Sequence, residues 1–442
     1  MNLSTLRTTL EQLGAAPVKS LGQNFLHDQN LARWIVDQLG LEPEDHLVEI
    51  GPGLGALSEF ALPQCASATL IEKDGRLADY LRGTFASERV EVRHEDALDF
   101  DVRTLFPRQP VKVLGNLPYY VTSPILFAFG AEPSPAQRMV FTVQREMAER
   151  LAAQHGSHVY GQPTVLLGRR WRIRLVKHLS ASVFLPNPKV QSSVITLDPR
   201  EPGELPDCEA GLFQSLVKRG FSQRRKQMRK LIGLEGWPDY AKQLGVSETA
   251  RAEQLSIGQW VELARLAGGE AGTVAQDVHR ERFDVVNERD EVVRVASRHE
   301  VHEGHLPHRA IHVFVFNERG ELFLQKRSRH KDRCAGLWDS SAAGHVEAGC
   351  DYEETAVREV KEELGVEASV ERVARLDASA ETGREFVGLY RARHDGPFWL
   401  PPAEIECGGF FPVELIDQWI GRRPEDFAGG FLACYKVWRS KE

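Results

Sequence analysis

Short apolar runs that alternate with helical segments constrain the fold of the N-terminal part of the chain most strongly. Four runs have the length and composition of buried strands, at residues 45–50, 68–72, 90–93 and 111–114. A helical pattern separates the second run from the third, at residues 75–85. Because parallel strands need a long crossover between them, this alternation predicts an α/β domain with a parallel sheet.

The rest of the chain shows a helical part and then a second α/β part. Strand signals fade over residues 207–267, where helical periodicity takes over, and strands return at residues 311–316 and 321–325. The glycine-rich stretch at residues 268–273 has the low hydrophobicity of a linker. These patterns predict an α/β domain at residues 1–200, a helical domain at 201–268, a linker at 269–281 and a second α/β domain at 282–442.

The composition is that of a soluble globular protein. Hydrophobic residues make up 42% of the 442 residues, and no run approaches the ~20 apolar residues of a membrane helix. The first residues lack the apolar core of a secretion signal. The six cysteines form no C-x-x-C pair, which argues against a zinc site or a disulfide framework. We therefore expect a cytoplasmic protein with reduced thiols and no membrane partner.

The formal net charge of −8, taken alone, argues against nucleic-acid binding. The charge is unevenly distributed, however, since residues 218–230 contain seven Lys or Arg and no acid. A basic patch binds phosphate even on an acidic chain, because the local potential decides. A charge run is usually a solvated helix face, but the density of this one favours contacts with RNA phosphates.

A glycine-rich turn follows the first predicted strand and precedes a helix. Gly51, Gly53 and Gly55 allow the backbone to approach a ligand that also faces the helix N-terminus. Glu72 ends the second strand, where a carboxylate can accept both hydroxyls of a ribose. Asp96 follows the third strand, where it can accept from an adenine amino group. Each feature is also typical of a tight turn or a solvated strand end, but the three in this order favour a nucleoside ligand.

The tetrapeptide Asn116-Leu117-Pro118-Tyr119 follows the fourth predicted strand. An exocyclic adenine amine is a poor nucleophile, because its lone pair conjugates with the ring. If the Asn116 side-chain oxygen and the Leu117 carbonyl each accept one N–H, the amine nitrogen becomes more tetrahedral and directs its lone pair at a sulfonium methyl group. Tyr119 can stack on the base, a contact that contributes ~1–3 kcal/mol. The tetrapeptide predicts methyl transfer by positioning, without a strong base; a loop capped by Asn and stiffened by Pro is the alternative.

Three glutamates share one face of a predicted helix in the second α/β domain. Glu359, Glu362 and Glu363 have i, i+3, i+4 spacing. Three like charges together are unfavourable without a counter-ion, and Mg²⁺ prefers oxygen ligands of this kind. A solvated acidic helix is the alternative, but an upstream loop that begins at Gly344 makes the pattern more specific. It predicts a Mg²⁺ site that bridges to a diphosphate.

Residues 18–267 resemble the KsgA-type family of ribosomal RNA adenine dimethyltransferases. The motifs that carry the resemblance, in family order, are residues 21–26, 116–120, 184–190, 221–231 and 251–256. The resemblance implies a Rossmann-like methyltransferase domain with a small helical RNA-binding domain and S-adenosylmethionine as cofactor. It implies dimethylation of the N6 amino groups of two adjacent adenines, in a 3′-terminal hairpin of 16S rRNA within the small ribosomal subunit, during subunit biogenesis.

The resemblance also assigns residues to the site. The positions implied at the cofactor are Gln23, Asn24, Leu26, Gly51, Gly53, Gly55, Glu72, Asp96 and Asn116. The catalytic positions implied are Asn116, Leu117, Tyr119 and Phe184, with Phe184 stacking on the target base from the side opposite Tyr119. Residues 221–231 are implied to form a basic helical segment.

The segment around the three glutamates resembles the Nudix box, Gly-x5-Glu-x7-Arg-Glu-aliphatic-x-Glu-Glu-x-Gly-aliphatic. The resemblance implies an α/β/α Nudix hydrolase domain that acts on a diphosphate substrate. The implied metal ligands are Gly344, Glu359, Glu362 and Glu363, with Glu362 and Glu363 also as catalytic candidates. Arg358 is implied to orient the site.

The chain departs from the Nudix box at one position. The first Glu of the box falls on Cys350, and a thiol does not replace a carboxylate in a salt bridge. We therefore expect a weakened box loop, with Asp351 as a candidate for compensation. Glu404 and Glu406 are candidates for a further metal ligand or base.

The wider C-terminal segment resembles the Nudix branch near isopentenyl diphosphate isomerase. The resemblance rests on residues 308–310, 325–328, 331–332 and 336–339. That isomerase requires a catalytic Cys just before the box glycine, where this chain has Ala343. Hydrolysis of an unidentified organic diphosphate is therefore favoured over isomerisation.

Two further classes of function stay open on the sequence. The N-terminal part can act as an RNA-binding assembly factor for the small subunit, with methylation incidental. The Nudix part can act as a non-catalytic binding module, which Cys350 alone supports.

Overall fold

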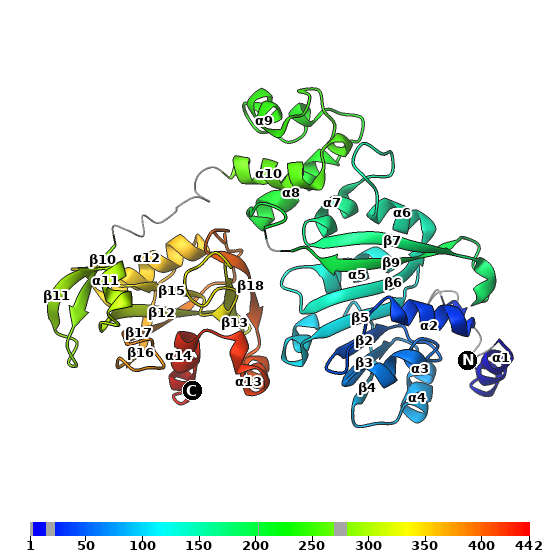
Figure 1. Ribbon diagram of the computed structural model, residues 1–442, viewed down its shortest axis with the longest axis horizontal. Coiled ribbons are helices and arrows are strands. Elements are labelled where there is room, and N and C mark those ends of the chain that lie inside the picture. The colour runs from blue at the N-terminus through cyan, green and yellow to red at the C-terminus, as the bar shows by residue number, and fades with distance from the viewer. Residues whose placement is uncertain (1–2, 15–22, 202, 269–280) are drawn as a thin grey trace. The chain divides into compact units, whose positions relative to one another are not determined.

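The computed structural model describes residues 3–14, 23–201, 203–268 and 281–442 (Figure 1). The chain divides into two compact units, residues 1–205 with 216–260 and residues 206–215 with 261–442. Nearly all of the predicted linker, residues 269–281, lies outside the described residues. The predicted domain boundaries stay predictions.

The first unit contains a seven-stranded sheet with the order β4-β3-β2-β5-β6-β9-β7 (Figure 1). Its strands are β2 (His46–Ile50), β3 (Ser67–Glu72), β4 (Val90–His94), β5 (Val111–Asn116), β6 (Ala136–Gln144), β7 (Trp171–Leu179) and β9 (Ser192–Pro199). The strands from β4 to β6 are parallel, whereas β9 is antiparallel to both β6 and β7. The predicted Rossmann-like α/β fold is confirmed, with an antiparallel pair that the alternation pattern did not reveal.

Apolar side chains pack on both faces of this sheet, as expected for a largely parallel sheet. Every residue of β2 is buried. The consecutive residues Leu47 and Val48 of this strand belong to different hydrophobic cores. The helices in this part of the chain are α2 (Gln29–Asp37), α3 (Ser58–Ala61), α4 (Gly75–Thr84), α5 (Thr122–Gly130), α6 (Arg145–Leu151) and α7 (Gln162–Gly168). Burial on both faces explains why the strands are continuous apolar runs in the sequence.

A short ribbon supports the site from the N-terminal side. Strand β1 (Phe25–Leu26) pairs antiparallel with β8 (Phe184–Leu185), so that Leu26 lies opposite Phe184. Helix α1 (Leu3–Gln12) contributes to the small core that contains Phe25. The ribbon joins two implied site residues that are far apart in the sequence.

The helical segment contains α8 (Ala210–Gly220), α9 (Trp237–Leu244) and α10 (Ile257–Ala267). The implied basic helix at residues 221–231 is wrong, because only a 3-10 turn at Met228–Lys230 is helical there. Phe221 stacks on Trp260 with ring centroids 5.6 Å apart, and the Met228 N–H donates to the Ala250 carbonyl. These contacts hold both ends of the run, and the basic side chains between them are exposed in a loop.

The second unit contains another seven-stranded sheet, with β14-β13-β12-β17-β16 as its main path. Its strands are β12 (His308–Phe316), β13 (Leu322–Arg327), β14 (Trp338–Asp339), β15 (Ala342–His345), β16 (Glu371–Leu376), β17 (Glu385–Arg393) and β18 (Ile405–Phe411). Helix α12 (Tyr352–Leu364) shares a core with β12, and Phe314 of β12 packs on α14 (Gly429–Arg439). The remaining helix is α13 (Val413–Arg422). Helices thus cover both faces, and the predicted α/β/α layers are confirmed.

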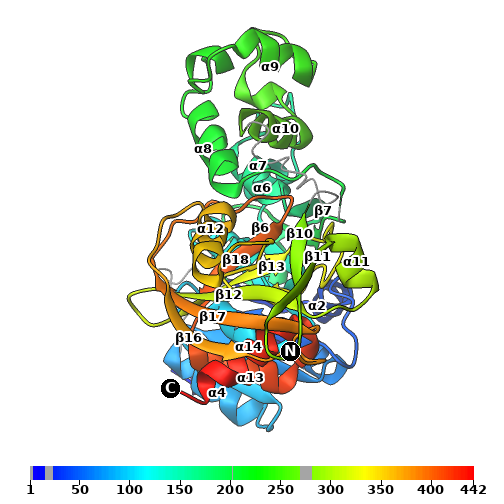
Figure 2. The same cartoon turned by 90° about the vertical axis from the view of Figure 1, so that its left-hand side faces the viewer.

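A hairpin precedes this sheet in the chain. It consists of β10 (Arg282–Val286) and β11 (Val292–Ser297), and α11 (Arg298–Glu303) packs against it (Figure 2). Residue Phe283 of β10 bridges to Glu347 in the loop between β15 and α12. The hairpin is therefore part of the surroundings of the Nudix-box loop.

Within the described part of the chain, every helix is too short or too polar to cross a membrane.

Candidate active sites

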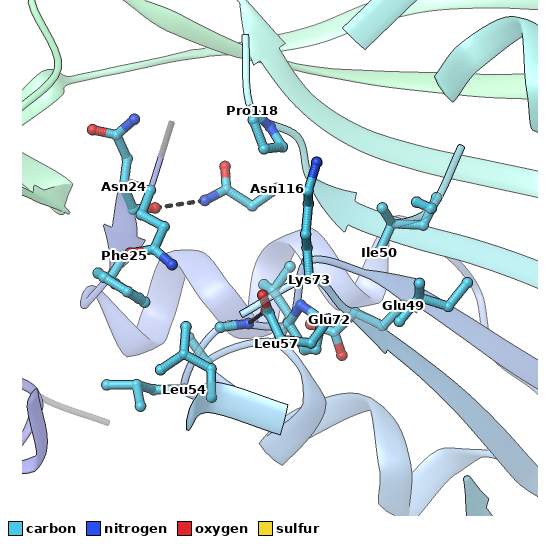
Figure 3. Close-up of a pocket in the computed structure, with 18 of the residues that line it drawn as sticks. Asn24, Phe25, Glu49, Ile50, Leu54, Leu57, Glu72, Lys73, Asn116 and Pro118 are labelled. Atoms are coloured by element: carbon cyan, nitrogen blue, oxygen red, sulfur yellow. Dashed lines mark hydrogen bonds between the residues drawn. The ribbon is translucent and has the colours of Figure 1, made fainter. Parts of the chain in front are cut away.

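The first pocket lies where the carboxyl ends of β2, β3 and β5 meet (Figure 3). The predicted cofactor residues that line it are Gln23, Asn24, Leu26, Gly51, Gly53, Glu72, Asp96 and Asn116. Gly51, Gly53 and Gly55 all have positive φ angles, of 64°, 61° and 80°, which favour glycine. Gly55 does not line the pocket, because it packs against Phe85. Its role is to shape the turn.

Glu72 ties the glycine loop to the end of β3. Its side chain is 6% exposed, and its two carboxylate oxygens accept from the Gly53 N–H at 3.0 Å and the Asp74 N–H at 2.9 Å. Burial raises the pKa of the Glu72 carboxyl, and the backbone N–H groups oppose that shift. The carboxylate lies at the strand end where the sequence predicts it. Its lone pairs suit the hydroxyls of a ribose, so the site fits a nucleoside cofactor.

Asp96 is paired with a residue that the sequence analysis did not consider. The Lys73 ammonium donates to one Asp96 oxygen at 2.5 Å, and the Leu98 N–H donates to the other at 3.0 Å. The hydrogen bond from Lys73 lowers the pKa of Asp96. The carboxylate is therefore ionised and able to accept, but an adenine amino group would share it with Lys73.

Glu49 is a second buried acid in this pocket that the sequence analysis missed. It lies in β2 at 1% exposure and accepts a hydrogen bond from the Ser58 hydroxyl at 2.6 Å. Burial raises the pKa of Glu49 to about 7. The signal that could have identified it is the presence of an acid inside the apolar run at residues 45–50.

The amide of Asn116 is held in one orientation. Its Nδ2 donates to the Asn24 carbonyl at 2.8 Å (Figure 3). A carbonyl only accepts, so the amide nitrogen must face Asn24, and the side-chain oxygen must point elsewhere. No described residue donates to that oxygen. It is thus available to accept an N–H from a ligand, as the sequence chemistry requires.

The other predicted base-binding residues do not line this pocket. Leu117 is 2% exposed, and its N–H donates to the Thr142 carbonyl at 3.0 Å. The Tyr119 hydroxyl bonds to the Ser192 hydroxyl at 2.8 Å, and burial raises the pKa of Tyr119. Phe184 is 2% exposed within a hydrophobic core. A base can stack on Phe184 only after its neighbours move, so its implied role stays a prediction.

The second pocket lies against β15 and α12. Gly344 is in such close contact with Glu359 that a Cβ at residue 344 would lie 2.4 Å from the Glu359 carboxyl carbon. Glu363 accepts from the Gln325 amide at 2.9 Å and from the Ala343 N–H at 3.1 Å. Any side chain at residue 344 would displace the Glu359 carboxylate, and the fold brings Gly344, Glu359 and Glu363 together.

The buried carboxylates of this pocket fit a divalent cation. Glu359 and Glu363 are 6% and 5% exposed. Burial, followed by the charge of a neighbouring glutamate, raises the pKa of both carboxyls. Oxygen ligands that repel one another are the donor set that Mg²⁺ accepts. Glu362 is half exposed and does not line the pocket, so the structure separates it from the other predicted ligands.

Arg358 contacts three carboxylates. Its guanidinium lies 3.0 Å from Glu347, 3.2 Å from Glu359 and 3.7 Å from Glu362. Cys350 is exposed, and the Asp351 carboxylate accepts from the Glu354 N–H as the N-cap of α12. Asp351 therefore does not compensate for Cys350.

Glu404 and Glu406 lie in different surroundings. Glu404 lines the pocket and lies 3.2 Å from the Lys331 ammonium. Glu406 pairs with Lys326 at 3.1 Å and Arg329 at 2.9 Å and does not line the pocket. Glu404 is thus the one of the two that stays a candidate for a further ligand or base.

A group of histidines lies beside this pocket, and the sequence analysis missed it. The ring nitrogens of His302, His308 and His345 lie within 4.8 Å of one another, and Glu385 lies 3.3 Å from His345. Burial lowers the pKa of His302 to about 3 and that of His308 to about 4. Neutral imidazoles and a carboxylate can together hold a metal ion. The fold gathers the three histidines from α11, β12 and β15 and Glu385 from β17, so no sequence spacing could have identified the group.

The fold and the first pocket define a methyltransferase of the Rossmann-like class. The family model described as ribosomal RNA adenine dimethylase matches residues 17–267, more than half of the chain. The chain belongs to this family. A second family model, described as the NUDIX domain, matches residues 306–427, so the C-terminal part is a Nudix domain.

Curated relatives support the family over the N-terminal part. A protein of Prosthecochloris aestuarii named ribosomal RNA small subunit methyltransferase A is 40% identical over 243 residues, which cover 55% of this chain and 90% of the relative. A protein of Bordetella bronchiseptica with the same name is 36% identical over 260 residues, covering 58% of this chain and 96% of the relative.

Among solved structures, one from Deinococcus radiodurans is 30% identical to this chain, with a TM-score of 0.33. The match covers 37% of this chain and all of the other chain.

Proposed function

We propose that the first unit uses S-adenosylmethionine to dimethylate the N6 amino groups of two adjacent adenines in a 3′-terminal hairpin of 16S rRNA. The reaction would belong to the biogenesis of the small ribosomal subunit. The observation that carries the proposal is the orientation of Asn116, whose side-chain oxygen is left to accept while its nitrogen is fixed on Asn24. The names of the curated relatives agree with a small-subunit substrate.

The residues of the pocket divide the work between binding and positioning. S-adenosylmethionine would supply an electrophilic methyl group. Glu72 would hold the ribose hydroxyls, and Asp96 would accept from the adenine amino group of the cofactor. Asn116 and the Leu117 carbonyl hold the N–H groups of the target amine. Positioning of this kind contributes to rate without a strong base.

Methyl transfer from labelled S-adenosylmethionine to undermethylated small subunits tests the proposal. We expect label on two adjacent adenines near the 3′ end of 16S rRNA after the modified bases are mapped. Binding of the subunits without any transfer of label would instead favour the assembly-factor function.

For the Nudix domain, we propose Mg²⁺-dependent hydrolysis of an organic diphosphate. Mg²⁺ would polarise the diphosphate and neutralise its charge. The observation that carries the proposal is the meeting of β15 with two buried glutamates, since Gly344 contacts Glu359 and the Ala343 N–H donates to Glu363. The basic residues that line the same pocket and suit phosphate groups are Arg298, Arg327, Lys331 and Arg333.

A panel of nucleoside and other organic diphosphates, incubated with the full chain and Mg²⁺, tests this activity. Glu363→Gln is the matched inactive variant, because it removes one ligand charge and keeps the side-chain volume. Absence of turnover on every diphosphate, together with absence of Mg²⁺ binding, would leave the binding-module function.

A further inference from the structure

The Nudix-box loop lacks the glutamate that normally fixes it, yet the structure shows this loop held at several points. The loop runs from Gly344, near the end of β15, to Cys350, just before α12. Cys350 has an exposed thiol and takes the place of the box glutamate. The loop must nevertheless stay in place, because Gly344 is in close contact with Glu359.

One anchor joins the loop to α12 through Glu347. The Glu347 carboxylate accepts from Arg358 at 3.0 Å, and the same guanidinium lies 3.2 Å from Glu359. Arg358 therefore bridges a loop carboxylate and a buried carboxylate of the pocket. Without Glu347, the whole charge of Arg358 would be directed to Glu359 and Glu362, where it would compete with a metal ion.

A second anchor joins the loop to β10. The Gly349 N–H donates to the Asp284 carboxylate at 3.1 Å, and the Ala348 N–H donates to the Arg282 carbonyl at 2.8 Å. Asp284 is 7% exposed. Strand β10 lies before residue 306, where the match to the NUDIX domain begins, so this anchor comes from outside the matched segment.

We propose that Glu347, assisted by Asp284, is the positioning residue that replaces the missing box glutamate and holds Gly344 and Glu359 in place for Mg²⁺. This proposal rests on the Nudix function proposed above. Glu347 and Arg358 are half and one-third exposed, and exposed ion pairs contribute little to global stability. A residue that orients metal ligands, by contrast, typically changes metal affinity about 10- to 100-fold. Loss of Glu347 should therefore lower Mg²⁺ affinity if the residue has a positioning role. It should lower the thermal stability if the residue has only a structural role.

The experiment measures Mg²⁺ affinity by calorimetry and the thermal midpoint of the full chain in parallel. Mg²⁺ is the suitable probe because histidine clusters bind it poorly compared with carboxylates. We expect Glu347→Gln to weaken Mg²⁺ binding about 10-fold while it changes the thermal midpoint no more than the control does. The matched control is Glu353→Gln, which changes an exposed glutamate in the first turn of α12.

The second variant tests replacement directly. Adding Cys350→Glu to Glu347→Gln returns a carboxylate to the box position and should restore the affinity, whereas Cys350→Ala alone should leave it unchanged. Wild-type affinity in Glu347→Gln, or no recovery in the double variant, would overturn the proposal and leave the Nudix function intact. No Mg²⁺ binding by the wild-type chain would overturn the Nudix function itself, and this proposal with it.

Discussion

Buried glutamates line both pockets, but after burial the strongest influence on their pKa is a hydrogen-bond donor in the first pocket and a neighbouring glutamate in the second. Glu72 accepts from two backbone N–H groups, and Glu49 accepts from a serine hydroxyl. Glu359 and Glu363 repel each other, and Glu404 adds to the repulsion. The same residue type therefore serves as a hydrogen-bond acceptor for an organic ligand in one pocket and as a charged ligand in the other. The partners of a carboxylate, not its burial, decide which.

Removal of divalent metal should separate the two pockets most sharply. We expect a chelator to abolish diphosphate hydrolysis, because the proposed reaction needs Mg²⁺ to polarise the diphosphate and neutralise its charge. Binding of S-adenosylmethionine, measured by calorimetry in the same buffer, should be unchanged. If the affinity for S-adenosylmethionine falls when the metal is chelated, the two pockets do not differ in their need for metal.

Asn116→Ala should reduce methyl transfer by on the order of 100-fold or more, because the target amine loses the acceptor that orients it. Cofactor affinity should stay close to wild type in this variant. Glu72→Ala should give the reverse pattern, a weakened cofactor affinity measured by calorimetry. Turnover of Asn116→Ala equal to wild type would show that the amide does not orient the amine.

The basic loop should respond to salt in a way that depends on each side chain. Arg224 is bonded to the carbonyls of His158 and Tyr160, whereas Arg225 and Lys226 are exposed. Neutralising Arg225 and Lys226 should lower the slope of log affinity for RNA against log salt by about 0.7–0.9 for each RNA phosphate that the variant no longer neutralises. Neutralising Arg224 alone is the comparison and should change the slope less. An unchanged slope in the double variant would mean that the loop is only solvated.

The pH dependence of the free energy of unfolding tests whether the pKa of the buried Glu49 carboxyl is raised. Its folded-state pKa of about 7 lies above the unfolded value of 4.5, so the folded protein binds the proton more tightly. Stability should therefore fall as pH rises from 4.5 through 7, by at most about 3 kcal/mol. Glu49→Gln cannot ionise, and its urea midpoint should vary less between pH 5 and 8. Identical pH profiles of the two proteins would contradict the raised pKa.

The sequence could predict what depends on residues close together in the chain. The strand positions, the glycine turn and Glu72 at the end of β3 follow from local apolar runs and spacing. The helix face of Glu359 and Glu363 follows from i, i+4 geometry. Glu362 shares that spacing, but its half exposure depends on how α12 is rotated against the sheet, which spacing does not determine.

Contacts between residues that are far apart in the chain could not be predicted from the sequence. The bond from Asn116 to Asn24 spans 92 residues, and the one from Gly349 to Asp284 spans 65. The proposed role of Glu347 in place of the box glutamate depends on the direction in which Arg358 extends. The implied basic helix failed for a similar reason, because the stacking of Phe221 on Trp260 is a tertiary contact that overrides local helix preference.

The separation of the two sheets along the chain has a consequence during synthesis. All strands of the first sheet lie between His46 and Pro199, and all strands of the second lie between His308 and Phe411. A ribosome that adds roughly 5–20 residues per second needs about five seconds or more to pass from Pro199 to His308. The first sheet can therefore pair its strands before those of the second exist. The nascent methyltransferase core is thus spared competition from foreign strand edges while it folds.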